Sequence, residues 1–190
     1  MTVLSTFVTG QVFTASDANN MANSGLTYIT SGSLSTATTD FVGCFSSTYD
    51  NYRIVITSPQ VSSAADIYFR LLDGTTPKIT NYYYGSVGFN TAGTALNTFG
   101  AGGTEVYTGW TCSAGGAGTD IGMLVADITT PFVAKKTSFA GSYMAFQTAY
   151  KVGTFSATQT DATSYSGLRI STLTAATLTG TATIYGYRKA

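Results

Sequence analysis

The 190-residue sequence contains no histidine. This absence excludes a Ser-His-Asp triad, a Cys-His pair, histidine-ligated zinc and imidazole acid–base catalysis. We therefore expect a protein without a catalytic site of these kinds, with no cofactor and no metal.

Charged residues are also scarce, at 9% of the chain, and nine Lys and Arg balance nine Asp and Glu. Zero net charge without a basic stripe argues against nucleic acid as the main partner. So few charges favour association over a freely soluble monomer. The composition is typical of a protein that works inside an assembly.

Long apolar runs are missing as well. No run approaches 18 residues, so we expect no membrane-spanning helix. Residues 1–10 contain no Lys or Arg and no continuous apolar core, which argues against a secretory signal. The two cysteines, Cys44 and Cys112, are too few for a disulfide scaffold and lie among apolar or aromatic neighbours. We expect buried, reduced thiols in a protein made in a cytoplasm.

The most abundant residues are small and polar. The chain has 35 Thr, 19 Ser and 21 Gly, which together make up about 39% of it. Thirteen Tyr and eleven Phe supply enough apolar surface for a core, so the chain is not a disordered low-complexity protein. Its length corresponds to one domain, or to one domain with an appendage.

The first residues differ from the rest. Thr14-Ala-Ser-Asp17 is close to a capping box, and a helix of about ten residues is expected from Ala15 to Ser24, ended by Gly25. A helix this short is unstable alone in water and must dock on something. We therefore predict an anchoring arm at residues 1–30, with Phe13, Asp17 and Met21 as candidate anchoring residues. Residues 30–39 are expected to form a polar linker or a weak edge strand.

From Asp40 onward the hydrophobic pattern has a period of two, as in half-buried strands. This predicts about ten short strands: residues 41–45, 52–57, 67–71, 82–89, 104–111, 121–128, 137–146, 152–158, 165–173 and 179–187. The predicted fold is all-β: an antiparallel β-sandwich over residues 31–190, jelly-roll-like rather than a closed barrel, with the short N-terminal helix.

Two stretches, Gly85–Gly103 and Ser113–Thr119, are rich in glycine. Neither is followed by Gly-Lys-Ser/Thr, so neither is a phosphate-binding loop. We expect surface loops between strands, which can also shape a binding tip or a contact between subunits. Aromatic residues near them are the candidate binding or contact surface, as a sugar platform or as simple packing: Tyr107, Trp110, Tyr82 and Tyr84.

A glycosidase needs only two carboxylates and no histidine, so this class needs separate consideration. The candidates are Glu105, Asp120, Asp127 and Asp161. Isolated Asp residues beside strands are ordinary turn residues, however. We expect a protein that is not an enzyme.

Several short motifs resemble those of tailed-phage virion proteins. The segment Gly10–Met21 places a glycine and a hydrophobic pair before a Thr-Ala-x-Asp helix with Asn following. The other matching pieces are Tyr49–Ile56, Ile67–Leu71, Asp127–Pro131 and Ile184–Tyr187. The sequence resembles small tail-fibre and structural proteins of marine and cyanobacterial phages over most of its length.

The resemblance implies a virion structural protein, synthesised in the host cytoplasm. The first expectation is a tail-fibre or spike protein for host attachment, bound to other virion proteins through its N-terminal arm and facing host-surface glycans. The alternative is a capsid decoration (cement) protein that stabilises the head shell. Three-fold symmetry is usual in the resembled proteins, so a homotrimer is expected.

Overall fold

The computed structural model describes residues 25–112, 122–146 and 150–188, with the side chains of 110–112 excepted. These residues form thirteen strands and no helix. The strands are β1 (Leu26–Leu34), β2 (Thr38–Phe41), β3 (Asn51–Val61), β4 (Ala65–Asp73), β5 (Thr76–Pro77), β6 (Tyr82–Asn90), β7 (Ala95–Gly103), β8 (Val106–Cys112), β9 (Met123–Thr129), β10 (Lys135–Phe146), β11 (Tyr150–Thr163), β12 (Gly167–Thr172) and β13 (Leu178–Tyr187).

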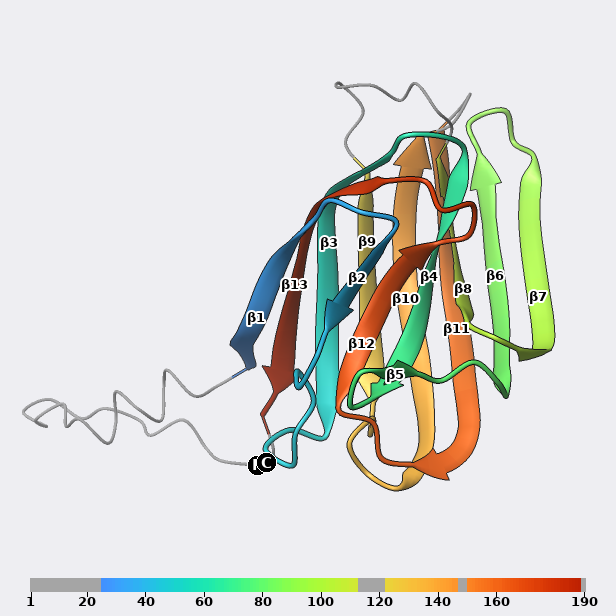
Figure 1. The fold of residues 1–190 in the computed structure, drawn as a ribbon. Coiled ribbons are helices and arrows are strands. Elements are labelled where there is room, and N and C mark those ends of the chain that lie inside the picture. The colour runs from blue at the N-terminus through green and yellow to red at the C-terminus, as the bar shows by residue number, and fades with distance from the viewer. Residues whose placement is uncertain (1–24, 113–121, 147–149, 189–190) are drawn as a thin grey trace, which may run out of the picture.

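The strands form two sheets that pack face to face (Figure 1). The large sheet has the order β1-β13-β3-β9-β10-β11-β6-β7. The small sheet has the order β2-β12-β4-β5, and β8 pairs with β4 beside β5. Every pairing is antiparallel. The prediction of an all-β antiparallel sandwich is confirmed.

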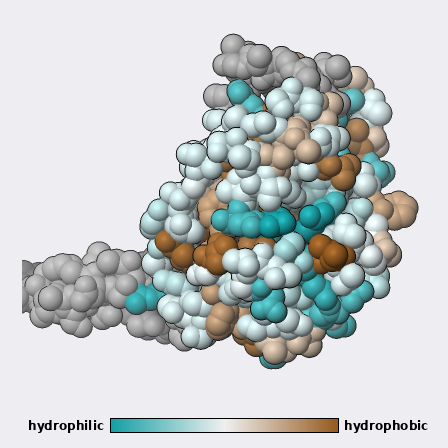
Figure 2. Space-filling model, in the orientation of Figure 1, coloured by the Kyte–Doolittle hydropathy of each residue, from teal (hydrophilic) through white to brown (hydrophobic). Residues whose placement is uncertain are grey.

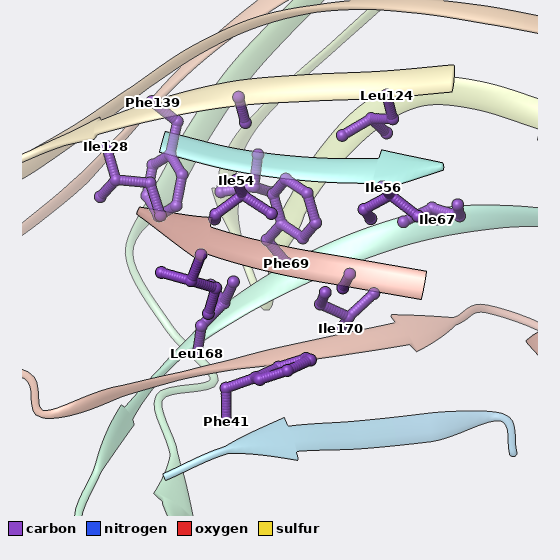
Figure 3. Packing of buried hydrophobic residues seen from close by; sticks show 14 of the residues in the cluster. Phe41, Ile54, Ile56, Ile67, Phe69, Leu124, Ile128, Phe139, Leu168 and Ile170 are labelled. Carbon is purple, nitrogen blue, oxygen red and sulfur yellow. The ribbon is translucent and has the colours of Figure 1, made fainter. Parts of the chain in front are cut away.

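The core is made by the period-two pattern that the sequence contains. Tyr52, Ile54 and Ile56 alternate along β3 and are fully buried, while their neighbours on the strand face outward. Ile67 and Phe69 of β4 meet them from the small sheet (Figure 3). Each buried side chain of this size stabilises the fold by about 1.5–3 kcal/mol relative to exposure. Burial between two faces therefore fixes the register of both sheets.

The structure differs from the predicted strands and loops in several segments. Residues 41–45 form the end of β2 and a turn rather than a strand. For residues 30–39 the edge-strand alternative is confirmed, since the stretch holds residues 30–34 of β1, an edge strand of the large sheet, and the start of β2. The glycine-rich stretch 85–103 is a hairpin of β6 and β7, not a surface loop, because backbone pairing needs no side chain at its glycines. The other glycine-rich stretch, 113–119, lies outside the described residues.

The predicted anchoring arm falls mostly outside the described residues, and with it the helix at 15–24 and Phe13, Asp17 and Met21. β1 begins at Leu26 and runs across the boundary predicted between residues 30 and 31. The backbone N–H of Arg188 donates to the carbonyl of Gly25, at 3.4 Å. The two ends of the described chain are therefore neighbours. Within the described ranges the model contains no helix that could cross a bilayer.

Candidate functional site

The four aromatic residues of the predicted contact surface have different environments. Tyr82 is fully buried, and its hydroxyl accepts a hydrogen bond of 2.9 Å from the backbone N–H of Leu71. Burial raises the pKa of Tyr82. Tyr82 is thus a core residue rather than part of a surface. Trp110 lies on β8, but its side chain is outside the described residues.

Tyr84 and Tyr107 do come together. Their ring centroids lie 5.9 Å apart, and Tyr107 is also 5.5 Å from the ring of Tyr68, its cross-strand partner on β4. The three rings connect the edge of the small sheet to β6 of the large sheet. Tilted aromatic pairs at these distances contribute about 0.5–1.5 kcal/mol each beyond burial. This aromatic row holds the two sheets together where the small sheet ends.

The large sheet extends beyond β8 as the β6–β7 hairpin (Figure 1). Between the hairpin and β8 lies a cleft of about 230 Å³, which we call the overhang cleft. It is lined by Ser86, Ala95, Leu96, Asn97, Thr98, Tyr107, Gly109, Tyr143 and Lys151. Hydroxyls, a phenol ring and one ammonium group therefore belong to the residues around this space. Such a set can hydrogen-bond a polyhydroxylated ligand and stack on one of its faces.

A glycine on β8 brings the walls of the cleft together. Gly109 has a φ of +79°, and a Cβ atom built there would lie 2.0 Å from Ser86 Oγ and 2.7 Å from the ring of Tyr143. No other residue fits this backbone conformation and this gap without movement. The close approach of β8 to β6 and β10 therefore depends on Gly109.

The carboxylates considered for glycoside hydrolysis are held in ion pairs. Glu105 pairs with Arg70, Asp127 with Arg53 and Asp161 with Lys78, whereas Asp120 lies outside the described residues. The Arg53 guanidinium holds the pKa of Asp127 below its ordinary value, and the Lys78 ammonium does the same for Asp161. Glycoside hydrolysis needs one carboxylic acid with a raised pKa. These two carboxyl groups are shifted in the opposite direction.

A row of charges crosses the outer face of the small sheet and forms the hydrophilic band in Figure 2. Arg169 makes a bidentate pair with Asp40, with distances of 2.7 and 2.8 Å, and its cross-strand neighbour Arg70 pairs with Glu105. These four residues neutralise one another. Beside them lies a smaller cleft of about 220 Å³ whose lining includes Thr38 and Ser171.

Sequence reasoning singled out Tyr107 and, as a whole stretch, residues 85–103, but it did not identify the individual cleft residues within that stretch and missed Gly109, Tyr143 and Lys151. Ser86, Thr98 and Lys151 come from three strands and belong to no motif. A register prediction for β6 and β7 is the signal that would have placed Ser86 beside Thr98. No family model, curated protein or solved structure matches the chain.

Proposed function

We propose that the protein is a non-enzymatic structural protein of a phage virion. In this proposal it is a tail-fibre or spike component, anchored through its N-terminal arm and displaying the sandwich for host attachment. The observation that carries the proposal is the position of Gly25, where the described chain begins, relative to the overhang cleft.

The arm joins the sandwich at one corner of the large sheet. Gly25 directly precedes edge strand β1. The first residue of β1 lies in register with Tyr187 of β13, Asn51 of β3 and Thr129 of β9, which together mark one end of the sheet. The overhang cleft lies under the other edge strand, β7, near the opposite end of the sheet, where Phe89 pairs with Ala95. A protein held at the first corner therefore presents the cleft at the diagonally opposite one, facing outward.

The strand order supports a jelly-roll wiring for this display domain. In a jelly roll of eight strands, one sheet has the order 1-8-3-6 and the other 2-7-4-5. Here β1-β13-β3-β9 and β2-β12-β4-β8 follow this order. Strands β6, β7, β10 and β11 are additions that widen the large sheet, and β5 is a short addition to the small sheet. Viral and lectin domains use this architecture, although a fold alone does not specify a function.

The proposed ligand of the cleft is a glycan of the host surface. Its lining offers hydroxyl groups from Ser86 and Thr98, which are directly opposite each other in the register, beside the Tyr107 ring. Neutral sugars need such polar groups together with an aromatic face, whereas a strongly charged ligand would need more than one cation.

The alternative is a capsid decoration protein. The observation that favours it is the exposed apolar outer face of the large sheet, which carries Val87, Phe89 and Phe99. Such a face suits a contact with a shell. In either role the proposed state is a homotrimer made in the host cytoplasm. Cys44 is a buried free thiol, and burial raises its pKa to about 12, which keeps it unreactive.

Gold-labelled antibodies on purified particles test the proposal. Label on the tail supports the attachment role, and label over the head supports decoration. Particles without label, from lysates in which the protein is abundant, would contradict a virion role.

A further inference from the structure

One row of apolar residues crosses the outer face of the large sheet. In the strand register, direct neighbours follow one another from β9 through β10, β11 and β6 to β7: Met123, Met144, Val152, Phe89 and Ala95. Tyr150 and Phe146 extend this row along β11 and β10, with ring centroids 5.0 Å apart. A sheet face in contact with water normally carries polar residues at these positions.

The apolar side chains of this face are well exposed. The exposed fraction is 59% for Val87, 58% for Phe89 and 86% for Phe99. Taking roughly 200 Å² for a fully exposed aromatic side chain and somewhat less for Val and Met, we obtain about 600 Å² for the patch with Tyr150, Met123 and Met144 included. This equals the largest apolar patches of ordinary monomers and approaches the ~800 Å² that each partner contributes to a stable interface.

The patch contains a groove that accepts a side chain. Its volume is about 530 Å³, and its lining is Val87, Gly88, Phe89, Ser142, Tyr143, Val152, Gly153 and Thr154. Gly88 and Gly153, between the outward-facing residues of β6 and β11, are directly opposite each other in the register. The groove lies within the range of roughly 300–1,000 Å³ typical of ligand-sized sites.

The charges around the groove indicate what kind of partner fits. None of the lining residues is charged, and the whole chain has zero net charge. β7 also lacks the Lys or Pro residues that protect edge strands from pairing, since its sequence is ALNTFGAGG. A second copy of the chain meets these conditions, because two neutral apolar faces associate without repulsion or unpaired charge.

We propose that the patch joins copies of this chain, with Phe99 of one copy seated in the groove of the next. Phe99 projects from β7, and the groove lies over β6, β10 and β11, so the two halves of the contact are different parts of the same sheet face. When Phe99 of each copy enters the groove of the next, the contact is heterologous and can close into a ring, such as a trimer. A buried aromatic anchor in a pocket is the usual centre of such an interface. This inference rests on the homotrimer of the proposed function and identifies the surface through which the copies join.

Sedimentation equilibrium of the full chain, at tens of micromolar, gives the first test. The wild type should have three times the 19.8 kDa mass of one chain. Phe99→Lys and Val87→Lys should each weaken association at least tenfold. Leu173→Lys is the matched control, because Leu173 is 58% exposed and lies outside the patch, and it should leave association unchanged. A thermal melt of each variant shows that the fold is retained.

A photo-crosslinker identifies the contact itself. With p-benzoylphenylalanine in place of Phe99, illumination of mixed heavy- and light-isotope chains should join position 99 of one copy to residues 87–89, 142–143 or 152–154 of another. A monomeric wild type would overturn both this interface and the trimer. A trimer that survives Phe99→Lys, or that crosslinks elsewhere, would overturn the interface alone. Neither result depends on where the protein lies in a virion.

Discussion

Tyr107 of β8 and Tyr84 of β6 place their rings 5.9 Å apart and so join the edge of the small sheet to the overhanging hairpin of the large one. Tyr84 packs in turn on β7, where a Cβ atom at Gly100 would lie 2.5 Å from its ring. The overhang cleft opens beside this pair. Its shape therefore depends on a few aromatic and glycine contacts that can be tested one at a time.

The first prediction concerns Gly109. Gly109→Ala should lower the free energy of unfolding by about 2–4 kcal/mol, because it adds left-handed backbone strain to a collision with Ser86 and Tyr143. The control is Gly93→Ala, whose φ of +75° is similar but whose surroundings are open. Gly93→Ala should lower the free energy of unfolding only by the left-handed backbone strain of an alanine, about 1–2 kcal/mol. Equal urea midpoints for the two variants would contradict the tight approach of β8.

The second prediction concerns Tyr82. Tyr82→Phe removes the acceptor for the backbone N–H of Leu71 and should lower the free energy of unfolding by about 1–3 kcal/mol. Tyr83→Phe should change it by less than about 0.5 kcal/mol, because Tyr83 is exposed. Chemical denaturation measures both. A larger loss for the Tyr83 variant would show that the two rings are placed the other way round.

The same pair illustrates what the sequence makes predictable. Alternation in the run Tyr82-Tyr83-Tyr84 places Tyr82 and Tyr84 on one face and Tyr83 on the other, as the burial shows. The pattern does not reveal which of the inward rings is covered by the second sheet. That depends on where the small sheet ends, which a local pattern does not contain. The sequence therefore suggested Tyr82 as a surface contact residue, whereas the structure places it in the core.

The hairpin of β6 and β7 shows a second limit. Strand β7 is rich in Gly and Ala and is mostly exposed on both faces, so it lacks the alternation that identified β3 and β4. The ion pair of Asp40 with Arg169 joins residues 129 positions apart. Only the strand register brings these two residues together. The strands of the core were thus predictable, whereas the cleft and the charged row were not.

The third prediction is a pH dependence. Arg53 first, and the Tyr187 hydroxyl second, lower the pKa of Asp127 in the folded protein. The stabilisation from Asp127 should therefore be complete above its unfolded pKa of about 3.9 and should be lost as the pH falls through the lower folded value. Asp127→Asn should cost less than about 1 kcal/mol at pH 7, because the pair is partly exposed, and this cost should shrink as the pH falls toward 2.

Thermal melts between pH 2 and pH 7 measure this effect. Tyr187→Phe should show a smaller change with the same sign, because it removes the weaker partner. A stability difference between wild type and Asp127→Asn that grows toward low pH would contradict the lowered pKa.

The fourth prediction separates the arm from the sandwich. Deletion of residues 1–24 leaves β1 and the hydrogen bond between Gly25 and Arg188 in place. The truncated protein should keep a β-type circular dichroism spectrum and a cooperative melt. It should fail to join the particle, because the predicted anchoring residues Phe13, Asp17 and Met21 are gone. Loss of the fold on truncation would show that the arm belongs to the core instead.

Blocking the overhang cleft tests the central claim most directly. Thr98 is exposed on β7 and lines the cleft, so Thr98→Trp should fill it at little cost in stability. Thr38→Trp is the matched control, because it fills the smaller cleft on the outer face of the small sheet. The measurement is the binding of purified protein, and of particles that carry it, to host cells. We predict at least a tenfold loss of binding for Thr98→Trp and less than a twofold change for Thr38→Trp, with unchanged melts. Binding by Thr98→Trp at the level of the wild type would contradict host attachment through the cleft.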